Sequence, residues 1–151
     1  MKLTLNRDYL HRHLFAALIA AGLGGWFGYD GLVRYPATPA AELYRKIERA
    51  DAPAGVDLEA FKAQKTRTQH GFAVFFLLAA AAIVLDLWKT SRFNFSFDDE
   101  GFTHNGKRTR YGDIKSVDRS RWKSRDILRV DGIVLDAWHH NGVMEFESKL
   151  A

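Results

Sequence analysis

The chain contains no cysteine among its 151 residues, which excludes disulfide scaffolds, thiolate metal sites, cysteine nucleophiles and iron–sulfur clusters. Charge is also absent from two long stretches, although 26% of all residues are charged and the formal net charge is +4. The mean hydropathy of −0.24 would be typical of a soluble globular protein. Here it averages two apolar segments with a polar remainder.

The first apolar stretch covers residues 14–33 and contains no charge before Asp30. A helix of this length reaches about 30 Å, which is the thickness of a bilayer's hydrocarbon core. Aromatic residues gather near its end, where a membrane interface would fall: Trp26, Phe27, Tyr29 and Tyr35.

The second apolar stretch covers residues 71–88, is uncharged until Asp86, and is followed by Lys89 and Arg92. An aspartate near the headgroups is tolerable, whereas at mid-bilayer it costs several kcal/mol. We therefore predict two transmembrane helices, at residues 14–33 and 70–89, that form a hairpin in an integral membrane protein.

Two alternatives make different use of these stretches. In the first alternative, both stretches are buried helices of a soluble domain, although such helices seldom lack a polar stripe. Otherwise the first would be a cleaved signal peptide, since Lys2, Arg7 and Arg12 precede it. Its length, the lack of an A-x-A site and the second apolar stretch favour the hairpin over the signal peptide.

Small residues recur at every fourth position of the first stretch: Ala16, Ala20, Gly24 and Gly28. Such spacing allows close approach of two helix backbones. We predict that these residues pack the two helices of one chain together. The alternative is that they join chains in a homo-oligomer.

Basic residues near the two stretches do not decide the orientation, because seven lie on each side. The terminal side has Lys2, Arg7, Arg12, Lys89, Arg92, Lys107 and Arg108, and the connecting loop has Arg34, Arg45, Lys46, Arg49, Lys62, Lys65 and Arg67. The lack of cysteine in the larger terminal portion favours a cytoplasmic location for both termini, with residues 1–13 as the N-terminal segment.

The connecting loop, residues 34–69, has helical patterns of its own. Thr38 and Pro39 predict a helix start, with the helix running to about Ala50. Asp57 predicts the N-cap of a second helix, which continues into the second apolar stretch for about thirty residues. We interpret the loop as an extracytoplasmic connector, with a partner-binding surface as the alternative.

The apolar period changes from helical to alternating after Thr90, which predicts a domain at residues 90–151. Turn residues divide it into five or six short strands. The predicted strands and turns are Phe93 to Phe97, a turn at 98–101, Phe102 to His104, a turn at Asn105-Gly106, a strand at 107–110, a turn at 111–114, a long strand from Ile114 to Trp122, a bend at 123–126, and a hairpin of 127–130 and 133–138 around Asp131-Gly132. Residues 141–150 fit a hairpin or a helix.

The segments FDDEGFTHNG, YGDIKSVDRSRW, ILRV and VLDAW make this domain resemble the bacterial pleckstrin-homology-like (PH-like) domains that follow short membrane anchors. The resemblance implies a bent antiparallel β-sheet or barrel with a short C-terminal helix. It also implies a cytoplasmic location at the bacterial inner membrane and no assigned activity. The fold class expected for the whole chain is therefore an α+β membrane protein.

The segment from Lys107 to Arg129 contains nine basic residues and three acidic ones. We predict that a basic surface of the domain binds anionic phospholipids or a protein partner, each charge contributing about 1 kcal/mol at an anionic bilayer. The candidate binding residues are Lys107, Arg108, Arg110, Lys115, Arg119, Arg121, Lys123 and Arg125. Nucleic acid is disfavoured because no aromatic stacking motif accompanies the charge, and a solvated surface is the plain alternative.

No spacing of serine, histidine, acid or glycine matches a catalytic, metal or phosphate motif, so we expect neither an enzyme nor a cofactor. The two function hypotheses are a membrane-anchored binding or scaffolding module and a structural subunit assembled through the hairpin. Within the domain, Trp122 and Trp138 each end a predicted strand, and we predict that both anchor its core.

Overall fold

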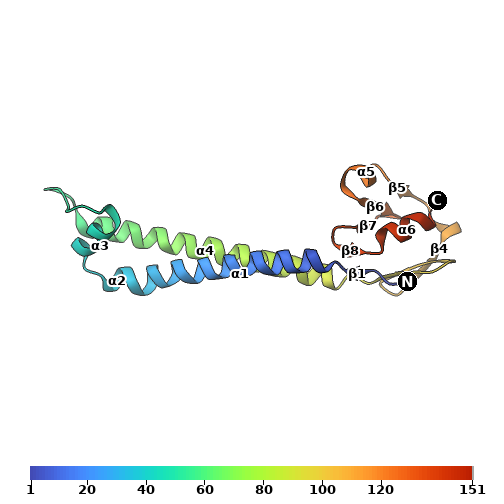
Figure 1. The fold of residues 1–151 in the computed structure, drawn as a ribbon, viewed down its shortest axis with the longest axis horizontal. Coiled ribbons are helices and arrows are strands. Elements are labelled where there is room, and N and C mark those ends of the chain that lie inside the picture. The colour runs from blue at the N-terminus through green and yellow to red at the C-terminus, as the bar shows by residue number, and fades with distance from the viewer. Residues whose placement is uncertain (151) are drawn as a thin grey trace. The chain divides into compact units, whose positions relative to one another are not determined.

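The computed structural model describes residues 1–150, which form two compact units. One unit comprises residues 14–84, and the other combines residues 1–13 with residues 85–150. The architecture is α+β, with two long apolar helices and small antiparallel sheets (Figure 1). Both helices are long and apolar enough to cross a membrane.

The helical elements are α1 (Arg7–Tyr29), a π-helical turn η1 (Asp30–Arg34), α2 (Tyr35–Ala37), α3 (Ala40–Glu48) and α4 (Leu58–Ser91). The predicted start of α4 is confirmed, because the Ala60 backbone N–H donates to Asp57 Oδ1 at 3.0 Å. At α1 the cap is Asn6, whose Oδ1 accepts from the Asp8 backbone N–H at 3.0 Å. Helix α4 has 34 residues and ends where the alternating pattern begins.

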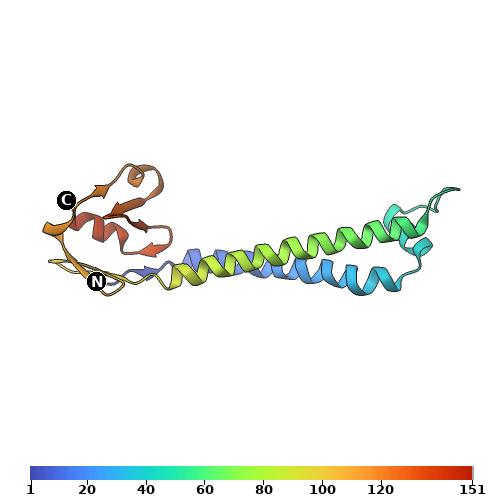
Figure 2. The ribbon, with the colours of Figure 1, turned by 180° about the vertical axis from the view of Figure 1, so that it is seen from behind.

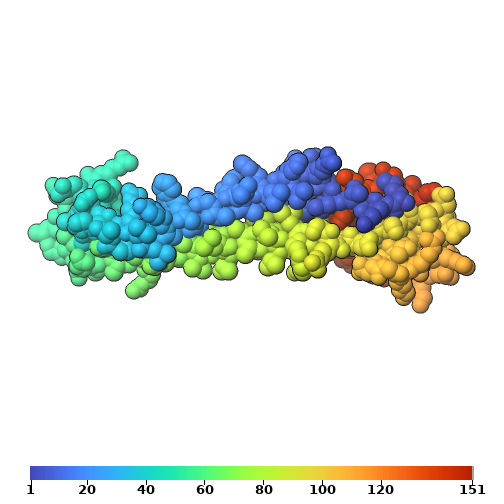
Figure 3. Space-filling model, turned by 90° about the horizontal axis from the view of Figure 1, so that it is seen from below, coloured from blue at the N-terminus to red at the C-terminus, as the bar shows by residue number. Residues whose placement is uncertain are grey.

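Small side chains and an aromatic cluster form the contact between α1 and α4 in the unit of residues 14–84. Phe27 of α1 packs on Phe72 and Phe76 of α4, with ring centroids 5.2 and 5.7 Å apart. Ala17, Ala20 and Gly24 are buried on α1, and Ala73 and Ala80 are buried on α4. Figure 3 shows the two helices in direct contact along this unit. The packing is tight, since a Cβ placed on Gly24 would lie 2.8 Å from Leu77 Cγ.

The structure brings some of the predicted packing residues together and leaves another outside the contact. Ala20 and Gly24 lie in the contact, and a Cβ on Gly28 would lie 3.9 Å from Ala73 Cβ. Ala16 is exposed, and Ala17 takes its place. The reason is geometric, because steps of four residues rotate about 40° around a helix, whereas alternating steps of three and four stay on one face.

Many large apolar side chains of this unit are exposed, although Leu77 and Phe72 also contact the facing helix. The exposed ones on α1 and α4 include Leu14, Phe15, Leu18, Ile19, Leu23, Trp26, Phe72, Val74, Phe75, Leu77, Leu78 and Val84. This distribution inverts that of a soluble helical hairpin, in which the large apolar residues face inward.

The loop helix begins one residue later than predicted. Thr38 Oγ1 donates to the Arg34 carbonyl at 2.7 Å, so Thr38 ends the preceding helix and does not cap the next. Helix α3 then runs from Ala40 to Glu48 and ends at Arg49, which has a left-handed backbone. Tyr44 packs on Phe61 of α4, with ring centroids 4.8 Å apart.

The second unit contains two three-stranded antiparallel sheets and a C-terminal helix. One sheet has the order β2 (Phe95–Phe97), β3 (Gly101–His104) and β4 (Lys107–Arg110); the other has β5 (Val117–Asp118), β6 (Ile127–Val130) and β7 (Ile133–Asp136). Helix α6 (Val143–Lys149) lies between them in the view of Figure 2. The ambiguous C-terminal segment therefore contains this helix, preceded by the short strand β8 (His140–Asn141).

The first residues of the chain complete this unit. Strand β1 (Thr4–Leu5) pairs antiparallel with β8. Leu3 is 3% exposed and donates its backbone N–H to the Phe95 carbonyl at 2.9 Å, so the segment also covers the edge of β2. Residues 1–13, which are predicted only as an N-terminal segment, are therefore part of the fold of this unit.

Phe146 of α6 occupies the centre of the core. Its ring contacts Phe95, Phe97 and Phe102 at centroid distances of 4.9, 5.2 and 5.6 Å, and it is fully buried. Leu128 and Leu135 of the other sheet are also fully buried in this cluster. Apolar residues from both sheets thus meet around one aromatic ring.

The prediction of a long strand from Ile114 to Trp122 is wrong. Only Val117–Asp118 forms a strand there, and Trp122–Arg125 forms the one-turn helix α5. Asp118 Oδ1 accepts the Ser120 backbone N–H at 2.8 Å, which starts a turn directly after β5. Asp126 follows α5 with a left-handed backbone and ends it.

The two tryptophans predicted for the core differ in environment. Trp122 is partly buried and packs against the core cluster. Trp138 is 47% exposed, so its assignment to the core is wrong. It follows β7 in a loop, where its backbone N–H donates to Asp136 Oδ1 at 2.8 Å, and the strand has already ended.

We expect Gly24→Ile to destabilise the packing of α1 on α4 by about 1 to 3 kcal/mol, because the added side chain overpacks the contact with Leu77. Gly25→Ile is the matched control, since a Cβ there meets nothing within 4 Å. Thermal unfolding of the two purified proteins, followed by helical circular dichroism, measures the difference. Equal unfolding temperatures would contradict the assigned contact.

We expect Phe146→Ala to unfold the β unit, because truncating a buried aromatic residue costs about 3 to 5 kcal/mol. Trp138→Ala should change stability by no more than about 1 kcal/mol, since its ring is half exposed. Limited proteolysis of both full-length variants measures this contrast. Rapid cleavage of the Trp138 variant within residues 92–150 would show that its ring is a core element after all.

Candidate functional site

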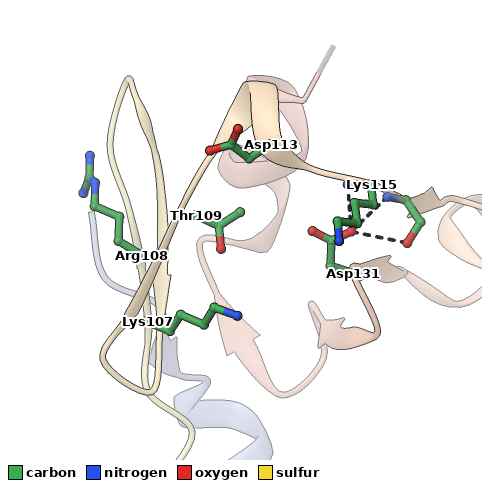
Figure 4. A pocket seen from close by; sticks show the side chains of 7 residues that line it. Lys107, Arg108, Thr109, Asp113, Lys115 and Asp131 are labelled. Carbon is green, nitrogen blue, oxygen red and sulfur yellow. Dashed lines mark hydrogen bonds between the residues drawn. The ribbon is translucent and has the colours of Figure 1, made fainter.

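A cleft of about 570 Å³ opens between β4 and the segment that leads into β5 (Figure 4). It is lined by Lys107, Arg108, Thr109, Asp113, Lys115, Ser116 and Asp131. Three of the predicted binding residues, Lys107, Arg108 and Lys115, therefore lie around one cavity.

Strand β4 supplies one wall of the cleft. Figure 4 shows Lys107 and Thr109 pointing into the space between the sheets and Arg108 pointing the other way. This follows from the two-residue period of a strand. Strand β4 lies close to β3 because position 101 is glycine: a Cβ there would lie 2.2 Å from the Thr109 carbonyl oxygen.

Asp131 organises the opposite wall. Its Oδ1 accepts the backbone N–H groups of Lys115 and Ser116, both at 2.9 Å. Asp131 and Gly132 have positive φ values of 48° and 82°, the conformation of a two-residue hairpin turn, so the predicted hairpin is confirmed. The turn thereby fixes the backbone that carries the Lys115 side chain.

A smaller cavity of about 140 Å³ continues the cleft toward the core. Its lining includes Phe102, His104 and Ile133 together with Lys107, Thr109 and Asp131. Phe102 lies opposite Thr109 in the β3–β4 ladder and is 1% exposed. The cleft therefore combines a small apolar floor with polar walls that carry two lysines, Lys107 and Lys115, and two acids, Asp113 and Asp131.

Arg108 serves the fold of the first hairpin. Its guanidinium donates to both carboxylate oxygens of Asp98, at 2.8 and 2.9 Å. These bonds, helped by the backbone N–H groups of Glu100 and Gly101, hold the pKa of Asp98 well below its usual range. The same contact raises the pKa of Arg108.

The remaining predicted basic residues do not form one surface with the cleft. Arg119 donates to Glu147 Oε1 at 3.0 Å and to the Leu150 carbonyl at 3.1 Å, which ties it to α6. Arg121, Lys123 and Arg125 belong to α5 and its N-cap, on a different side of the unit from β4 in Figure 1. Within residues 1–150, Lys107, Arg110 and Lys115 have no ion-pair partner.

The cleft also exposes an unpaired strand edge. Strand β4 pairs only with β3, and β5 pairs only with β6. The opposite edge of the first sheet is covered, because Leu3 and Met1 bond to the backbone of β2. Unpaired edges are surfaces on which a further extended chain can pair.

The histidines do not assemble into a metal site among residues 1–150, where no group of three or more suitable ligands converges. His140 is 7% exposed, and its Nε2–H donates to the Thr90 carbonyl at 3.3 Å. Burial lowers the pKa of His140, which favours the neutral ring. His140 therefore joins β8 to the end of α4.

Sequence reasoning found the lysines of the cleft but missed Thr109, Ser116 and the apolar floor. The Asp131-Gly132 turn was the available signal for that wall, because an aspartate at a hairpin turn often accepts backbone N–H groups. Its partners lie fifteen and sixteen residues earlier in the chain and cannot be identified from spacing.

Comparison with known proteins finds no matching family model, no matching curated protein and no matching solved structure.

Proposed function

We propose that the protein is an integral membrane protein whose helical hairpin holds a non-enzymatic binding module at the bilayer surface. The observation that carries the membrane part is the inverted packing of α1 and α4. Small residues occupy much of their contact, where Phe27 of α1 also packs on Phe72 and Phe76 of α4, while many large apolar side chains are exposed on the outside.

The free-energy argument is direct. Keeping one large apolar side chain out of water is worth about 1.5 to 3 kcal/mol. With a dozen such side chains about half exposed on α1 and α4 of the hairpin unit, a water-soluble form would forgo about 10 to 20 kcal/mol, which is comparable with the 5 to 15 kcal/mol that stabilises a typical protein. Lipid tails remove this penalty.

We place residues 14–33 and 70–89 in the bilayer and residues 34–69 on the extracytoplasmic side. Two spans return the chain to the side on which it began. This agrees with the pairing of β1 with β8, which requires both ends of the chain in one compartment. The resemblance to PH-like domains favours the cytoplasm of a bacterial cell, and two small sheets with a C-terminal helix support that resemblance.

The binding part of the proposal rests on the cleft. Its lysines attract an acidic partner, its apolar floor receives side chains, and the open β4 edge pairs with an extended backbone. An acidic protein segment uses all three features, whereas a lipid headgroup uses only the charge. We therefore favour an extended acidic segment of a protein over an anionic phospholipid.

A second candidate function is a structural subunit that assembles through the hairpin. It is favoured by Gly22 and Gly25, which are exposed on α1 with nothing within 4 Å of a Cβ placed on either. A second helix can approach closely at such positions. In this case the Gly25→Ile variant would lose a stable oligomer while keeping its own fold.

The cleft is tested with the full-length protein in nanodiscs of zwitterionic lipid, using a labelled peptide of alternating glutamate and valine as the probe. We expect the double variant Lys107→Glu/Lys115→Glu to bind about tenfold or more weakly, because two attractive charges become repulsive. Fluorescence anisotropy measures the affinity. Lys123→Glu/Arg125→Glu on α5 is the matched control and should bind as the unaltered protein does.

Two results would contradict the assignment. One is equal peptide affinity for the cleft variant and the unaltered protein. The other is that the protein does not bind the peptide but does bind phosphatidylserine in the nanodiscs. That result would identify the lipid as the ligand.

A further inference from the structure

The loop that carries Trp138 is fixed beside the first residue before α1. The Asn6 backbone N–H donates to the His139 carbonyl at 2.8 Å, and Asn6 Nδ2 donates to the Trp138 carbonyl at 3.1 Å. Asn6 is itself the N-cap of α1. The position of the loop is thereby tied to the start of the helix.

The indole of Trp138 extends from this loop along α1. The guanidinium carbon of Arg12 lies 5.3 Å from the centre of the ring, a cation–π distance. The residue is nevertheless 47% exposed. About half of the apolar surface of this indole is therefore left uncovered beside a cation.

The depth of the ring follows from helix geometry. Arg12 is six residues after Asn6, or about 9 Å along α1 at 1.5 Å per residue. It is two residues before Leu14, where the uncharged stretch begins. Because helical side chains tilt toward the N-terminus, the Trp138 ring lies on the domain side of Leu14, within about 12 Å along α1 of the level where the first span would enter the bilayer.

Helix α4 carries a second pair of the same kind where its apolar stretch ends. The Arg92 guanidinium carbon lies 4.2 Å from the centre of the Trp88 ring, and Trp88 is 51% exposed. The Tyr9 hydroxyl donates to Asp86, which fixes the end of α4 relative to the start of α1. Two tryptophan–arginine pairs thus flank the same end of the hairpin.

We propose that Trp138 inserts into the headgroup layer of the bilayer, so that the β unit contacts the membrane through its own loop as well as through the two spans. This inference rests on the proposed membrane insertion. Tryptophan is enriched at membrane interfaces, where its ring is partly apolar and its N–H remains hydrated. The paired arginines interact there with lipid phosphates.

The contact has a consequence for the binding module. A domain attached only by two helix ends can pivot, whereas a third attachment at Trp138 fixes which face of the sheets turns toward the cytoplasm. The orientation of the β4 cleft is then set by the loop after β7.

The test uses the full-length chain, whose four tryptophans are reduced to one by substitution with phenylalanine. Proteins that keep only Trp138, only Trp26 or only Trp122 are reconstituted into phosphatidylcholine vesicles containing lipids brominated at known depths. We expect bromines near the headgroup to quench Trp138 at least twofold more strongly than bromines near the chain end. Trp122, which packs against the domain core, should not be quenched by any of these lipids.

The outcomes separate the inference from the proposal on which it rests. If Trp26 is quenched by brominated lipid while Trp138 is quenched only by aqueous iodide, the hairpin is inserted and the inference about Trp138 is wrong. If Trp26 is not quenched either, the proposed membrane insertion fails as well.

A second version avoids the triple substitution. The chain has no cysteine, so Trp138→Cys and Ser148→Cys on α6 each accept one environment-sensitive fluorophore. A fluorophore at position 138 should show blue-shifted emission in vesicles. A fluorophore at position 148 should show the emission wavelength of a water-exposed fluorophore. Identical, water-like emission at both positions would overturn the inference.

Discussion

The close contact of α1 with α4 is the constraint on which the rest of the structure depends. Glycine and alanine occupy much of it, so the two backbones lie close together. At Gly24 of α1 there is no room for a Cβ beside Leu77 of α4. The contact is narrow at Gly24, and many leucine, phenylalanine and valine side chains of the two helices remain exposed, although the rings of Phe27, Phe72 and Phe76 pack across it. Those exposed side chains support the proposed membrane hairpin, because lipid would supply an apolar environment for them.

The β unit depends on an interaction of a different kind, between segments far apart in the sequence. Leu3 contributes to the same core as Phe146, and β1 pairs with β8. The chain therefore leaves the β unit at α1 and returns to it along α4. This closure agrees with the proposed pair of spans, since two spans would return the chain to the side on which it began.

Local signals in the sequence predicted most of the elements. Long uncharged stretches identified both apolar helices, Asp57 marked the start of α4, and Asp131-Gly132 marked the hairpin of β6 and β7. Each of these features depends on neighbours within a few residues. Patterning over such distances can be interpreted without knowledge of the fold.

Features that depend on distant partners could not be predicted in this way. The pairing of Thr4 with Asn141 has no local signal, and the predicted strand through Trp122 was ended by a turn at Asp118. Prediction of the candidate site was limited in the same way, because Arg108 and Arg119 form ion pairs with acids at the distant positions 98 and 147. The excess of charge was visible in the sequence, but which charges are free was not.

The central claim is that the outer surface of α4 faces lipid, and spin labels on single cysteines measure this most directly in the cysteine-free chain. Labels at Val74, Leu78 and Leu85, which are all exposed, should collide freely with oxygen and rarely with a water-soluble nickel chelate in vesicles. A label at Glu59, in the polar first turn of α4, should show the reverse. Frequent nickel collisions at positions 74, 78 and 85 would mean that water covers this surface, and would contradict the account.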